Sequence, residues 1–422
     1  MRILWLCNMI PPAVASDLGM KASDKEGWVL GALNALSGEP EYELAVAFPV
    51  PRAHDGYRGK DGKVGFFGFY EDTGRPEAYD PVLPYRLKSI VDEFEPEVVH
   101  VFGTEYPHTL AMCEVFREDP GRVLIGLQGI VDACREHYLD GLPDRVVNRV
   151  TFRDLLKRDS LKQQKKKFAL RADNEAKALK LAANVTGRTP FDKEASLTVN
   201  PGLKYHFMNE TLRSGFYELP SEKPIKEPYS IFISQGNYPI KGAHYMIEAL
   251  ALLKKEFPSA RLIIAGDNIT KHATLKERIK LSSYGKYLLE LIERYSLREC
   301  VVFTGSLNAS AFRERMLRST VYVCPSTIEN SPNSLGEAML LKVPCVAARV
   351  GGIPGIFDDG RDGILYEPDN IAALAEAVAS VWRDPDKAEE YTDHAREHAL
   401  MTHDPGENLK RLKEIYRSIA ER

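Results

Sequence analysis

The sequence predicts an α/β protein of two domains, each built on a doubly wound parallel sheet that helices cover. Two observations support this prediction. The chain has 422 residues, which is too long for one ordinary hydrophobic core and suits two domains of about 200 residues each. Short apolar runs alternate with segments of helical periodicity in both halves, which is typical of parallel strands joined by helical crossovers.

Composition excludes several classes of function. Apolar residues make up 44% of the chain and charged residues 27%, which is ordinary for a globular protein. The net charge of −4 argues against nucleic-acid binding, because nucleic-acid binders present strongly basic surfaces. The six cysteines are scattered and form no C-x-x-C pair, so we expect free thiols in a reducing compartment.

The N-terminus carries two features of a secretory signal, namely Arg2 and the small residues from Ala13 to Ala15. Its apolar run is broken at Asn8, however, and is shorter than the roughly 7–15 residues of a signal core. A first parallel strand from Arg2 to Cys7 is the better interpretation. Because no run approaches the roughly 18–20 apolar residues of a membrane span, we expect a cytoplasmic protein.

In the first half, apolar runs ending in turn residues predict strands, and apolar residues at helical spacing predict helices. The predicted strands span residues 3–7, 44–48, 64–69, 98–102, 123–127 and 185–189. The predicted helices span residues 26–36, 84–94, 107–116 and 155–183. We assign residues 1–200 to a first domain and the irregular, proline-containing residues 201–228 to a segment between the domains.

The second half repeats the alternation, and we assign residues 229–407 to a second domain. The predicted strands span residues 231–234, 261–265, 301–303, 321–324 and 344–348. The predicted helices span residues 243–257, 309–317, 371–382 and 408–420, with an interrupted helix between the second and third strands. Because ligands of such sheets bind at the carboxyl ends of strands, the turns that follow the strands are the first places to search.

The most informative stretch runs from Ser319 to Gly355. Its strand ends at Pro325, and a helix follows a polar loop. We expect Ser331 to cap this helix and Pro332 to take its first position, where a missing N–H costs nothing. The first turn would present free N–H groups at the positive end of the helix dipole, which suits a phosphate. These groups belong to Asn333, Ser334 and Leu335.

Two glutamates, Glu329 and Glu337, flank this anion site, and a nucleotide sugar explains both features. Its diphosphate accepts from N–H donors, and its ribose and hexose hydroxyls donate to carboxylates. Residues 329–352, ENSPNSLGEAMLLKVPCVAARVGG, resemble the donor-binding signature of the retaining glycosyltransferases of family 4. The resemblance implies that Glu337 binds ribose, that Glu329 lies at the donor sugar, and that the backbone of residues 331–335 meets the diphosphate. A solvated helix face with ordinary caps is the structural alternative.

The turn after the first strand of the second domain extends the resemblance. Family members carry Gly-Arg in this turn and Lys-Gly at the helix start. Gly236 and Lys241 match the pattern, and Lys241 is implied to hold the diphosphate. Asn237 stands where the arginine is expected, which removes a fixed charge and a bidentate donor. Gly27 opens the first helix of the other domain, where it permits a close backbone approach to a diphosphate or serves an ordinary helix start.

Three residues that follow the strand at 98–102 are candidates on the acceptor side. Gly103, Thr104 and Glu105 lie at a strand end, where parallel sheets bind ligands. Each also has a structural interpretation, because Gly103 permits a tight turn, Thr104 can cap the next helix, and Glu105 can face solvent. The ligand and structural interpretations are left open here.

Gln128 and Arg188 complete the acceptor-side candidates. Many family members carry a histidine near the position of Gln128, which can hydrogen-bond a sugar hydroxyl but cannot shuttle a proton. Arg188 follows the strand at 185–189, where it either contacts a ligand or pairs with an acid such as Asp192. His100, inside a strand, is interpreted as a core histidine.

The predicted helix 155–183 is strongly basic between residues 156 and 171, which contain one acid, Asp159. A basic amphipathic helix can dock on an anionic membrane surface or on an acidic partner. The alternative is a solvated face whose apolar stripe, including Leu161 and Phe168, packs on the domain. The cluster lacks interleaved aromatic residues, so it does not indicate nucleic-acid binding.

The resemblance implies the GT-B fold, with two Rossmann-like domains facing across a cleft and residues 408–422 packing back on the first domain. It implies a retaining hexosyltransferase that moves a sugar from a nucleotide diphosphate sugar to a hydroxyl of a glycan or lipid-linked acceptor. The implied setting is surface polysaccharide assembly. The inner face of the membrane is one location open to such a cytoplasmic protein. The implied catalytic residues are Glu329, Lys241 and Gln128. No cofactor or metal is expected, because the only D-x-D motif, at 384–386, lies in a distant helix connection.

Three other functions remain open on the sequence. A GT-B epimerase or phosphorylase would keep the fold and release a different product. A non-catalytic nucleotide-sugar binding protein would agree with the departures at Asn237 and Gln128. A nicotinamide oxidoreductase shares the alternation of strands and helices, but VGGIPG at 350–355 lacks the G-x-G-x-x-G spacing of a dinucleotide fingerprint.

Overall fold

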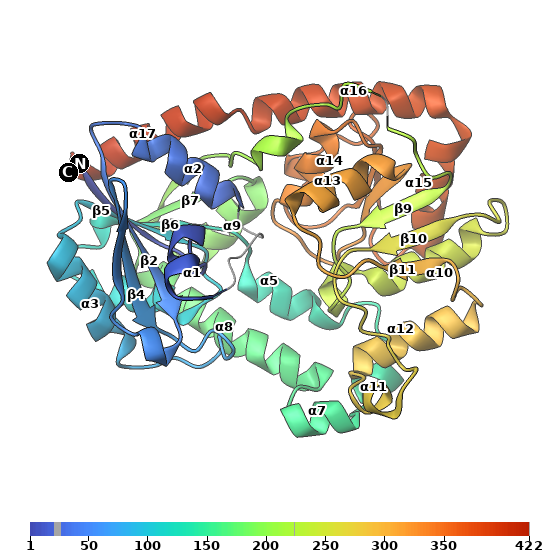
Figure 1. Cartoon of the computed structure of the whole chain (residues 1–422), viewed down its shortest axis with the longest axis horizontal. Helices are drawn as coiled ribbons and strands as arrows, with labels where there is room; N and C mark the ends of the chain where they lie inside the picture. The colour runs from blue at the N-terminus through green and yellow to red at the C-terminus, as the bar shows by residue number, and fades with distance from the viewer. Residues whose placement is uncertain (21–26, 223, 422) are drawn as a thin grey trace. The chain divides into compact units, whose positions relative to one another are not determined.

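The structure is a computed structural model that describes residues 1–20, 27–222 and 224–421. The chain divides into two compact units, each with its own sheet (Figure 1). Unit 1 comprises Met1–Asp132, Lys167–Thr211 and His403–Arg422. Unit 2 comprises Ala133–Lys166 and Leu212–Thr402. Residues 133–166, which the sequence analysis grouped with the first domain, therefore belong with the second sheet.

Unit 1 contains an eight-stranded sheet in the order β3-β4-β2-β1-β5-β6-β7-β8. Only β3 and β4 pair antiparallel among these strands. The six predicted strands are present, and β3 and β8 are additional edge strands whose mostly exposed residues form no apolar run. The strands are β1 (Arg2–Leu6), β2 (Glu43–Val50), β3 (Arg58–Asp61), β4 (Val64–Tyr70), β5 (Val98–Phe102), β6 (Val123–Gly126), β7 (Asn184–Gly187) and β8 (Lys204–Phe207).

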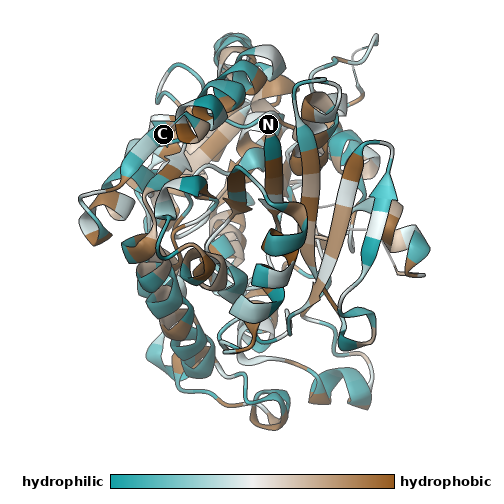
Figure 2. Ribbon diagram, turned by 90° about the vertical axis from the view of Figure 1, so that its left-hand side faces the viewer, coloured by the Kyte–Doolittle hydropathy of each residue, from teal (hydrophilic) through white to brown (hydrophobic). Residues whose placement is uncertain are grey.

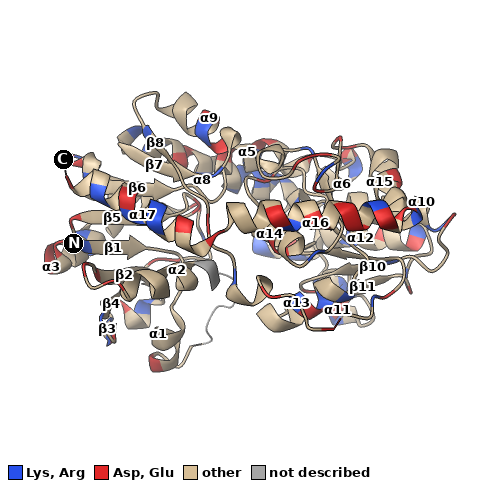
Figure 3. Cartoon of the chain, turned by 90° about the horizontal axis from the view of Figure 1, so that it is seen from above, with Lys and Arg blue, Asp and Glu red and all other residues tan. Residues whose placement is uncertain are grey.

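Helices flank this sheet, and charged side chains lie mainly on helices and loops rather than on the strands (Figure 3). The helices with residues in unit 1 are α1 (Pro12–Asp17), α2 (Gly27–Ser37), α3 (Leu83–Phe94), α4 (Pro107–Val115), α5 (Val131–Glu136), α8 (Leu161–Leu181), α9 (Pro190–Val199) and α17 (Pro405–Ala420). Short 3₁₀ turns are η1 (Arg52–His54) and η2 (Pro120–Arg122). The helices α5 and α8 also contribute residues to unit 2.

The core of unit 1 includes the C-terminal helix α17, in agreement with the expected packing of residues 408–422. Leu412, Ile415 and Tyr416 are buried against strand residues such as Trp5. The Tyr416 hydroxyl lies 2.7 Å from Nδ1 of His100, whose pKa burial lowers to about 3. His100 is thus the core histidine that the sequence predicted. Figure 2 shows hydrophobic colour concentrated along the central strands.

Unit 2 contains a six-stranded, entirely parallel sheet in the order β11-β10-β9-β12-β13-β14. The five predicted strands are confirmed, and the three-residue β14 is additional because it is too short to give a periodic signal. The strands are β9 (Ser230–Ile233), β10 (Arg261–Ile264), β11 (Val301–Phe303), β12 (Val321–Cys324), β13 (Cys345–Ala348) and β14 (Ile364–Tyr366).

The helices of unit 2 include α16, which the sequence analysis did not predict. They are α6 (Asp144–Val147), α7 (Phe152–Lys157), α10 (Ala243–Leu253), α11 (Leu275–Ile279), α12 (Ser283–Arg294), α13 (Ala309–Arg318), α14 (Asn333–Leu340), α15 (Ile371–Arg383) and α16 (Pro385–Thr402). The 3₁₀ turns are η3 (His137–Leu139), η4 (Ser214–Phe216), η5 (Pro239–Lys241) and η6 (Ile353–Gly355).

The predicted single helix 155–183 is wrong, because the chain breaks between α7 and α8. Arg158 adopts a left-handed conformation with φ of +50° and ends α7. Ser160 then starts α8, since its backbone N–H donates to Gln163 Oε1 and its hydroxyl accepts from the Gln163 N–H. The break changes which apolar residues face the protein.

Residues 133–166 join unit 2 through buried polar contacts with α12. Asp154 is fully buried, and its Oδ2 accepts from the backbone N–H and the hydroxyl of Ser283 at 2.9 and 2.5 Å. Glu290 of α12 also pairs with Arg145 and Arg149, at 2.8 and 2.7 Å. These contacts between residues far apart in sequence explain why linear domain boundaries failed here.

All six cysteines are free, as the sequence predicted, and four of them are buried. Among the helices that the structure describes, none combines the length and the apolar character needed to cross a bilayer.

Replacing Tyr416 tests the packing of α17. We expect Tyr416→Ala to lower the free energy of unfolding by about 3–5 kcal/mol, because it removes a large buried side chain and leaves a cavity. Tyr416→Phe should cost only about 1–2 kcal/mol, through the lost hydrogen bond to His100. Urea denaturation measures both variants, and an unchanged midpoint for Tyr416→Ala would contradict a buried α17.

Candidate functional site

The candidate site in unit 2 begins at the carboxyl ends of β9 and β12, which are neighbours in the sheet. Carboxyl ends of parallel strands lie at one edge of a sheet, so the turn at 234–242 lies beside the loop at 325–332. A backbone hydrogen bond joins the two segments, from the N–H of Thr327 to the carbonyl of Ile240 at 2.8 Å. The predicted donor-binding residues come from these segments and from α14.

Lys241 and Glu329 form an ion pair between the two segments. Lys241 Nζ lies 2.5 Å from Glu329 Oε1, and the Ser326 hydroxyl donates to the same oxygen at 2.7 Å. Both charged side chains are mostly buried. Burial favours the neutral lysine, but the adjacent Glu329 carboxylate outweighs this effect, so the pKa of Lys241 lies above its ordinary value. Lys241 is therefore a fixed positive charge.

Gly242 allows this close approach of the two backbone segments, and Gly236 lies tightly packed in the same turn. Gly242 has φ of +66°, and a Cβ atom there would lie only 1.8 Å from the carbonyl oxygen of Pro325. At Gly236, a Cβ atom would lie 2.7 Å from Ile264 Cγ2. Neither position accommodates a larger side chain without movement, which accounts physically for the glycine at position 236 that the sequence analysis selected.

Asn237, the departure from the family pattern, packs against Gly266. Its Oδ1 atom is buried and has no hydrogen-bond partner among the residues that the structure describes. The side chain contributes to a cavity of about 440 Å³. Other residues of that cavity include Arg153, Asn268, Lys271 and Lys280. Asn237 thus offers an unused acceptor where the family carries a cation.

The start of α14 differs by one residue from the prediction. Pro332 has φ of −70° and ψ of 109°, so it is the N-cap, and the helix begins at Asn333. The predicted cap at Ser331 and first position at Pro332 are therefore wrong. The Leu335 N–H, predicted to be free, donates to the Pro332 carbonyl at 2.9 Å. Proline offers no side-chain acceptor, so its side chain does not cap this helix N-terminus, whose dipole still favours an anion.

Ser334 joins α14 to the sheet through its hydroxyl. Its Oγ lies 2.7 Å from the hydroxyl of Tyr322 on β12, and Ser234 Oγ lies 3.2 Å from both groups. Tyr322 is completely buried, and burial raises the pKa of its hydroxyl well above the ordinary value. The hydroxyl of Ser334 is thus used in packing, which leaves its backbone as the group available to a phosphate.

Glu337, in the second turn of α14, is buried and paired with a residue that the sequence analysis did not select. Arg213 donates from Nε to Oε1 and from Nη2 to Oε2, both at 2.6 Å. Burial raises the pKa of Glu337, and Arg213 opposes part of this rise. Arg213 lies in NETLRSGFY at 209–217, a stretch with no periodicity or motif from which its partner could be predicted.

Gln128 and Arg188 lie together in unit 1, joined by Glu210. Gln128 Nε2 donates to Glu210 Oε1, and Arg188 Nη1 donates to Glu210 Oε2, both at 2.6 Å. The acid expected beside Arg188 was Asp192, which instead accepts from the backbone N–H of Arg188 at 2.9 Å. Glu210 was missed because it belongs to a segment that the sequence analysis treated as irregular. Contact of Gln128 or Arg188 with a ligand stays a prediction.

Gly103, Thr104 and Glu105 form a compact turn after β5. Gly103 has φ of +90°, and a Cβ atom there would lie 2.1 Å from Glu105 Oε2. The Thr104 hydroxyl donates to Glu175 of α8 at 2.5 Å, and Tyr106, not Thr104, is the N-cap of α4. The capping alternative for Thr104 is therefore wrong.

Two acids lie close together at this turn in unit 1, namely Glu105, which is half-buried, and Glu175 of α8, which is buried. Burial raises the pKa of Glu105 and brings that of Glu175 to about 7. Glu175 also accepts from the backbone N–H groups of Val131 and Asp132 at 3.1 Å. Its carboxylate therefore holds the start of α5 against α8. Gly27 is the first residue of α2, and its predicted role stays a prediction.

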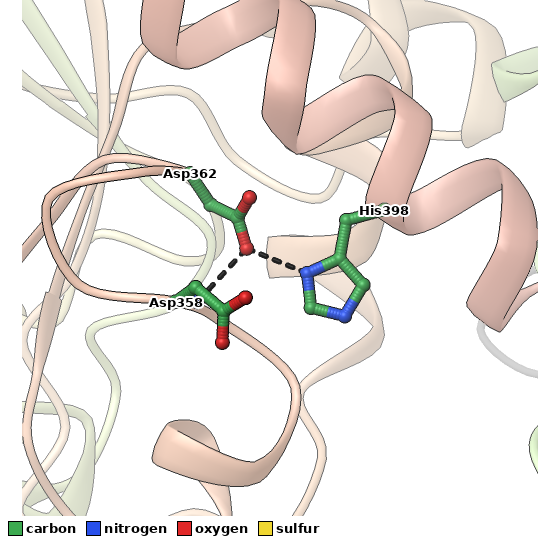
Figure 4. Close-up of side chains that lie close together, drawn as sticks. All are labelled: Asp358, Asp362 and His398. Atoms are coloured by element: carbon green, nitrogen blue, oxygen red, sulfur yellow. Dashed lines mark hydrogen bonds and ion pairs between the residues drawn. The ribbon is translucent and has the colours of Figure 1, made fainter.

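A group of potential metal ligands that the sequence analysis did not select consists of Asp358, Asp362 and His398 in unit 2 (Figure 4). Their nearest ligand atoms lie within 4.8 Å of one another. Asp362 Oδ2 accepts from Nδ1 of His398 at 2.6 Å and from the backbone N–H of Asp358 at 2.8 Å. These internal bonds make the group a tether between the loop after η6 and α16. The hydrogen bond to Asp362 raises the pKa of His398.

Comparison with known proteins agrees with the geometry of unit 2. Residues 217–398 match the family model described as glycosyl transferases group 1. This segment, which is less than half of the chain, is thus similar to the group 1 glycosyltransferases. The segment contains Lys241, Glu329 and Glu337.

Curated relatives match over parts of the chain. Alpha-maltose-1-phosphate synthase of Mycolicibacterium smegmatis is 39% identical over 114 residues, which cover 26% of this chain and 30% of that protein. A putative teichuronic acid biosynthesis glycosyltransferase of Bacillus subtilis is 29% identical over 118 residues, covering 28% and 30%. The aligned parts span less than half the length of the curated relatives first matched.

Solved structures match over nearly the whole chain and show the GT-B fold. Sucrose-phosphate synthase from Thermosynechococcus elongatus has a TM-score of 0.71 at 16% identity, covering 99% of both chains. HepE from Anabaena, solved in complex with UDP, has a TM-score of 0.66 at 17% identity, covering 99% of this chain and 100% of that chain.

The His398–Asp362 pair predicts a pH-dependent contribution to stability. Because the pKa of His398 is raised in the folded state, the contribution is full below the unfolded pKa of about 6.5 and is lost as pH rises through the folded pKa. We expect about 1 kcal/mol from this partly buried pair. Thermal unfolding of wild type and His398→Gln should therefore differ at pH 6 and converge at pH 9. A constant difference would contradict a titrating pair.

Proposed function

We propose that this chain is a retaining glycosyltransferase that transfers a hexose from a nucleotide diphosphate sugar to a hydroxyl group. The observation that carries the proposal is the ion pair of Lys241 and Glu329 at the carboxyl ends of β9 and β12, inside the segment that matches the family. The helix that follows β12 carries the buried Glu337. Positive charge beside an uncapped helix start suits a diphosphate, and carboxylates suit the hydroxyls of ribose and hexose.

Each residue then has a distinct role. Lys241 and the N-terminus of α14 offset the charge that develops on the departing diphosphate, without a metal ion. Glu337 accepts from the ribose, and Glu329 accepts from the donor sugar while holding Lys241. The acceptor attacks on the face from which the nucleotide leaves, and the leaving phosphate takes the acceptor's proton. The protein contributes mainly orientation and preorganised charge.

The substrates are proposed from relatives. A UDP-sugar is the first donor to test, because HepE was solved with UDP. A glycan or lipid-linked acceptor in surface polysaccharide assembly agrees with the teichuronic acid relative. Gln128 and the turn 103–105 are the proposed acceptor-side groups. A non-catalytic nucleotide-sugar binding protein is the second candidate, since Asn237 removes a cation that family members use.

Donor binding and turnover of Glu337→Ala test the proposal. We expect the wild type to release UDP from a panel of UDP-sugars when an acceptor is present. Glu337→Ala should weaken UDP binding by about 1–3 kcal/mol, because charged hydrogen bonds to ribose are lost. Calorimetry measures binding, and a coupled assay measures UDP release.

Glu256→Ala is the matched control, because Glu256 makes a similar two-pronged pair with Arg383 at an exposed position. This variant should bind UDP like the wild type. Unchanged affinity in Glu337→Ala would refute the ribose role. Binding of a nucleotide sugar without any release of UDP, across several donors and acceptors, would favour the non-catalytic protein.

We further propose that α7 docks on an anionic membrane surface. The apolar residues Phe152, Leu155 and Leu156 are 63%, 69% and 75% exposed. The two leucines follow Phe152 by three and four residues, so all three lie towards one side of the helix. The opposite face carries Asp154, which is buried against α12. In Figure 1, α7 lies at the edge of unit 2. A helix that buries its acid and exposes its apolar face indicates a contact with an apolar partner.

Basic residues next to this apolar face indicate that the partner is anionic. Exposed basic side chains beside α7 are those of Lys157, Arg158, Lys162 and Lys166. The nearby acid Asp159 is already paired with Arg153 at 2.8 Å. Leu161 of α8 is buried, so the apolar stripe predicted there packs inward. An apolar helical face surrounded by lysine and arginine fits the boundary of an anionic bilayer, where acyl chains and headgroups meet.

Vesicle sedimentation tests the membrane contact. Wild type should sediment with vesicles containing phosphatidylglycerol and remain in solution with phosphatidylcholine alone. Replacing Phe152, Leu155 and Leu156 together by serine should weaken binding at least about tenfold, because apolar area leaves the interface. Met401→Ser, a change at a similarly exposed apolar residue of α16, is the control. Equal binding of all three proteins, or capture by an acidic protein but not by lipid, would refute the proposal.

A further inference from the structure

Arg213 clamps the carboxylate of Glu337 and has no role in the mechanism proposed above. The guanidinium makes two parallel hydrogen bonds to the carboxylate, each 2.6 Å long. Two such bonds fix both the position and the plane of a carboxylate, which one cation–carboxylate contact does not. Glu337 is 3% exposed, so solvent does not help to fix the position of its carboxylate.

Aromatic rings hold Arg213 in place. Its Cζ atom lies 4.5 Å from the centroid of the Phe216 ring and 5.1 Å from that of Phe312, within the range of cation–π contacts. Both rings are buried. A guanidinium stacked on rings loses little conformational freedom when it binds a carboxylate, so the clamp is preorganised.

The segment that carries Arg213 is itself anchored within unit 2. The Leu212 N–H donates to the Tyr217 hydroxyl at 2.9 Å. Arg396 donates to the Tyr217 carbonyl at 2.8 Å, and Arg313 donates to the Glu218 carbonyl at 2.6 Å. Residues on both sides of Arg213 are therefore fixed by side-chain hydrogen bonds.

The clamp leaves acceptor capacity on Glu337. A carboxylate offers about four lone-pair positions, and the two bonds from Arg213 occupy two of them. Two lone-pair positions remain on the carboxylate. A ribose with free 2′ and 3′ hydroxyls offers the same number of donors. We propose that Arg213 is the positioning residue of the nucleoside subsite, holding Glu337 charged and oriented to accept from both hydroxyls of a ribose. This inference rests on the proposed function.

Other charged groups near α14 are engaged elsewhere. On α16, Arg396 contacts carbonyl oxygens, including that of Leu340 at the far end of α14, and Asp393 pairs with Lys342. Two neutral hydroxyl groups also lie near α14, that of Tyr322 on β12 and that of Ser234 in the turn after β9. Both contact the hydroxyl of Ser334. Arg213 is the charged group that acts on the Glu337 carboxyl, where burial raises the pKa and Arg213 opposes the rise.

Discrimination between UDP and 2′-deoxy-UDP tests the inference. Wild type should bind UDP about tenfold or more tightly than the deoxy analogue, because one charged hydrogen bond is lost. In Arg213→Gln this ratio should fall towards one, since Glu337 is no longer oriented. Arg213→Lys should keep the charge and part of the discrimination. Arg383→Gln, which removes an arginine with a similar two-pronged bond at an exposed site, should behave as wild type.

The pH profile of UDP binding is the second readout. In Arg213→Gln, the loss of the arginine lets the pKa of Glu337 rise further. Affinity should then fall more steeply than in wild type as the pH is lowered, because the carboxylate is protonated at a higher pH. Titration of the UDP phosphate is common to all variants and cancels in the comparison. Glu337→Gln should remove the additional pH dependence.

The outcomes separate the two proposals. Absence of nucleotide binding in wild type would refute the proposed function. Wild-type binding accompanied by an unchanged deoxy ratio and pH profile in Arg213→Gln would overturn only the role of Arg213. If Arg213→Gln does not fold, Arg213→Lys decides, because a structural role alone predicts no change in its deoxy ratio.

Discussion

The pairing of β9 with β12 is the constraint on which the candidate site depends. It brings the turn that carries Lys241 beside the loop that carries Glu329, although 88 residues separate them in sequence. The close passage of Gly242 past Pro325 and the bond from Thr327 to Ile240 hold the two segments together. Because α14 starts from the same loop, the direction of its dipole and the position of Glu337 follow from the same strand pair.

Several buried charged residues in both units contact a partner that offsets their charge or satisfies their hydrogen bonds. Lys241 has Glu329, Glu337 has Arg213, and Arg188 has Glu210, while Asp154 accepts from Ser283. Removing one partner from such a group leaves a buried charge without compensation, which usually costs several kcal/mol. The pairs therefore hold the candidate site residues in one geometry. They also explain how two carboxylates can lie beside a site suited to a diphosphate, since each already has a cation.

Most strands were predictable because a buried parallel strand is a short apolar run ended by turn residues. The edge strands β3 and β8 gave no such run, and the start of α14 was misplaced because Pro332 adopts an extended conformation as N-cap. Glu329, Glu337 and Lys241 were selected as candidates from their positions in segments that resemble a family signature. Arg213 and Glu210 were not selected, because their partners lie far away in sequence. A pairing between distant residues leaves no local pattern in the sequence.

We propose that this site binds a nucleoside diphosphate. Thermal unfolding of the wild-type chain with UDP, GDP, ADP and NAD in turn tests it most directly. A ligand at ~100 times its dissociation constant adds about 2.7 kcal/mol to stability, which gives a clear shift in the unfolding temperature. We expect such a shift with one nucleoside diphosphate. A shift with NAD alone, or with none of the four, would contradict it.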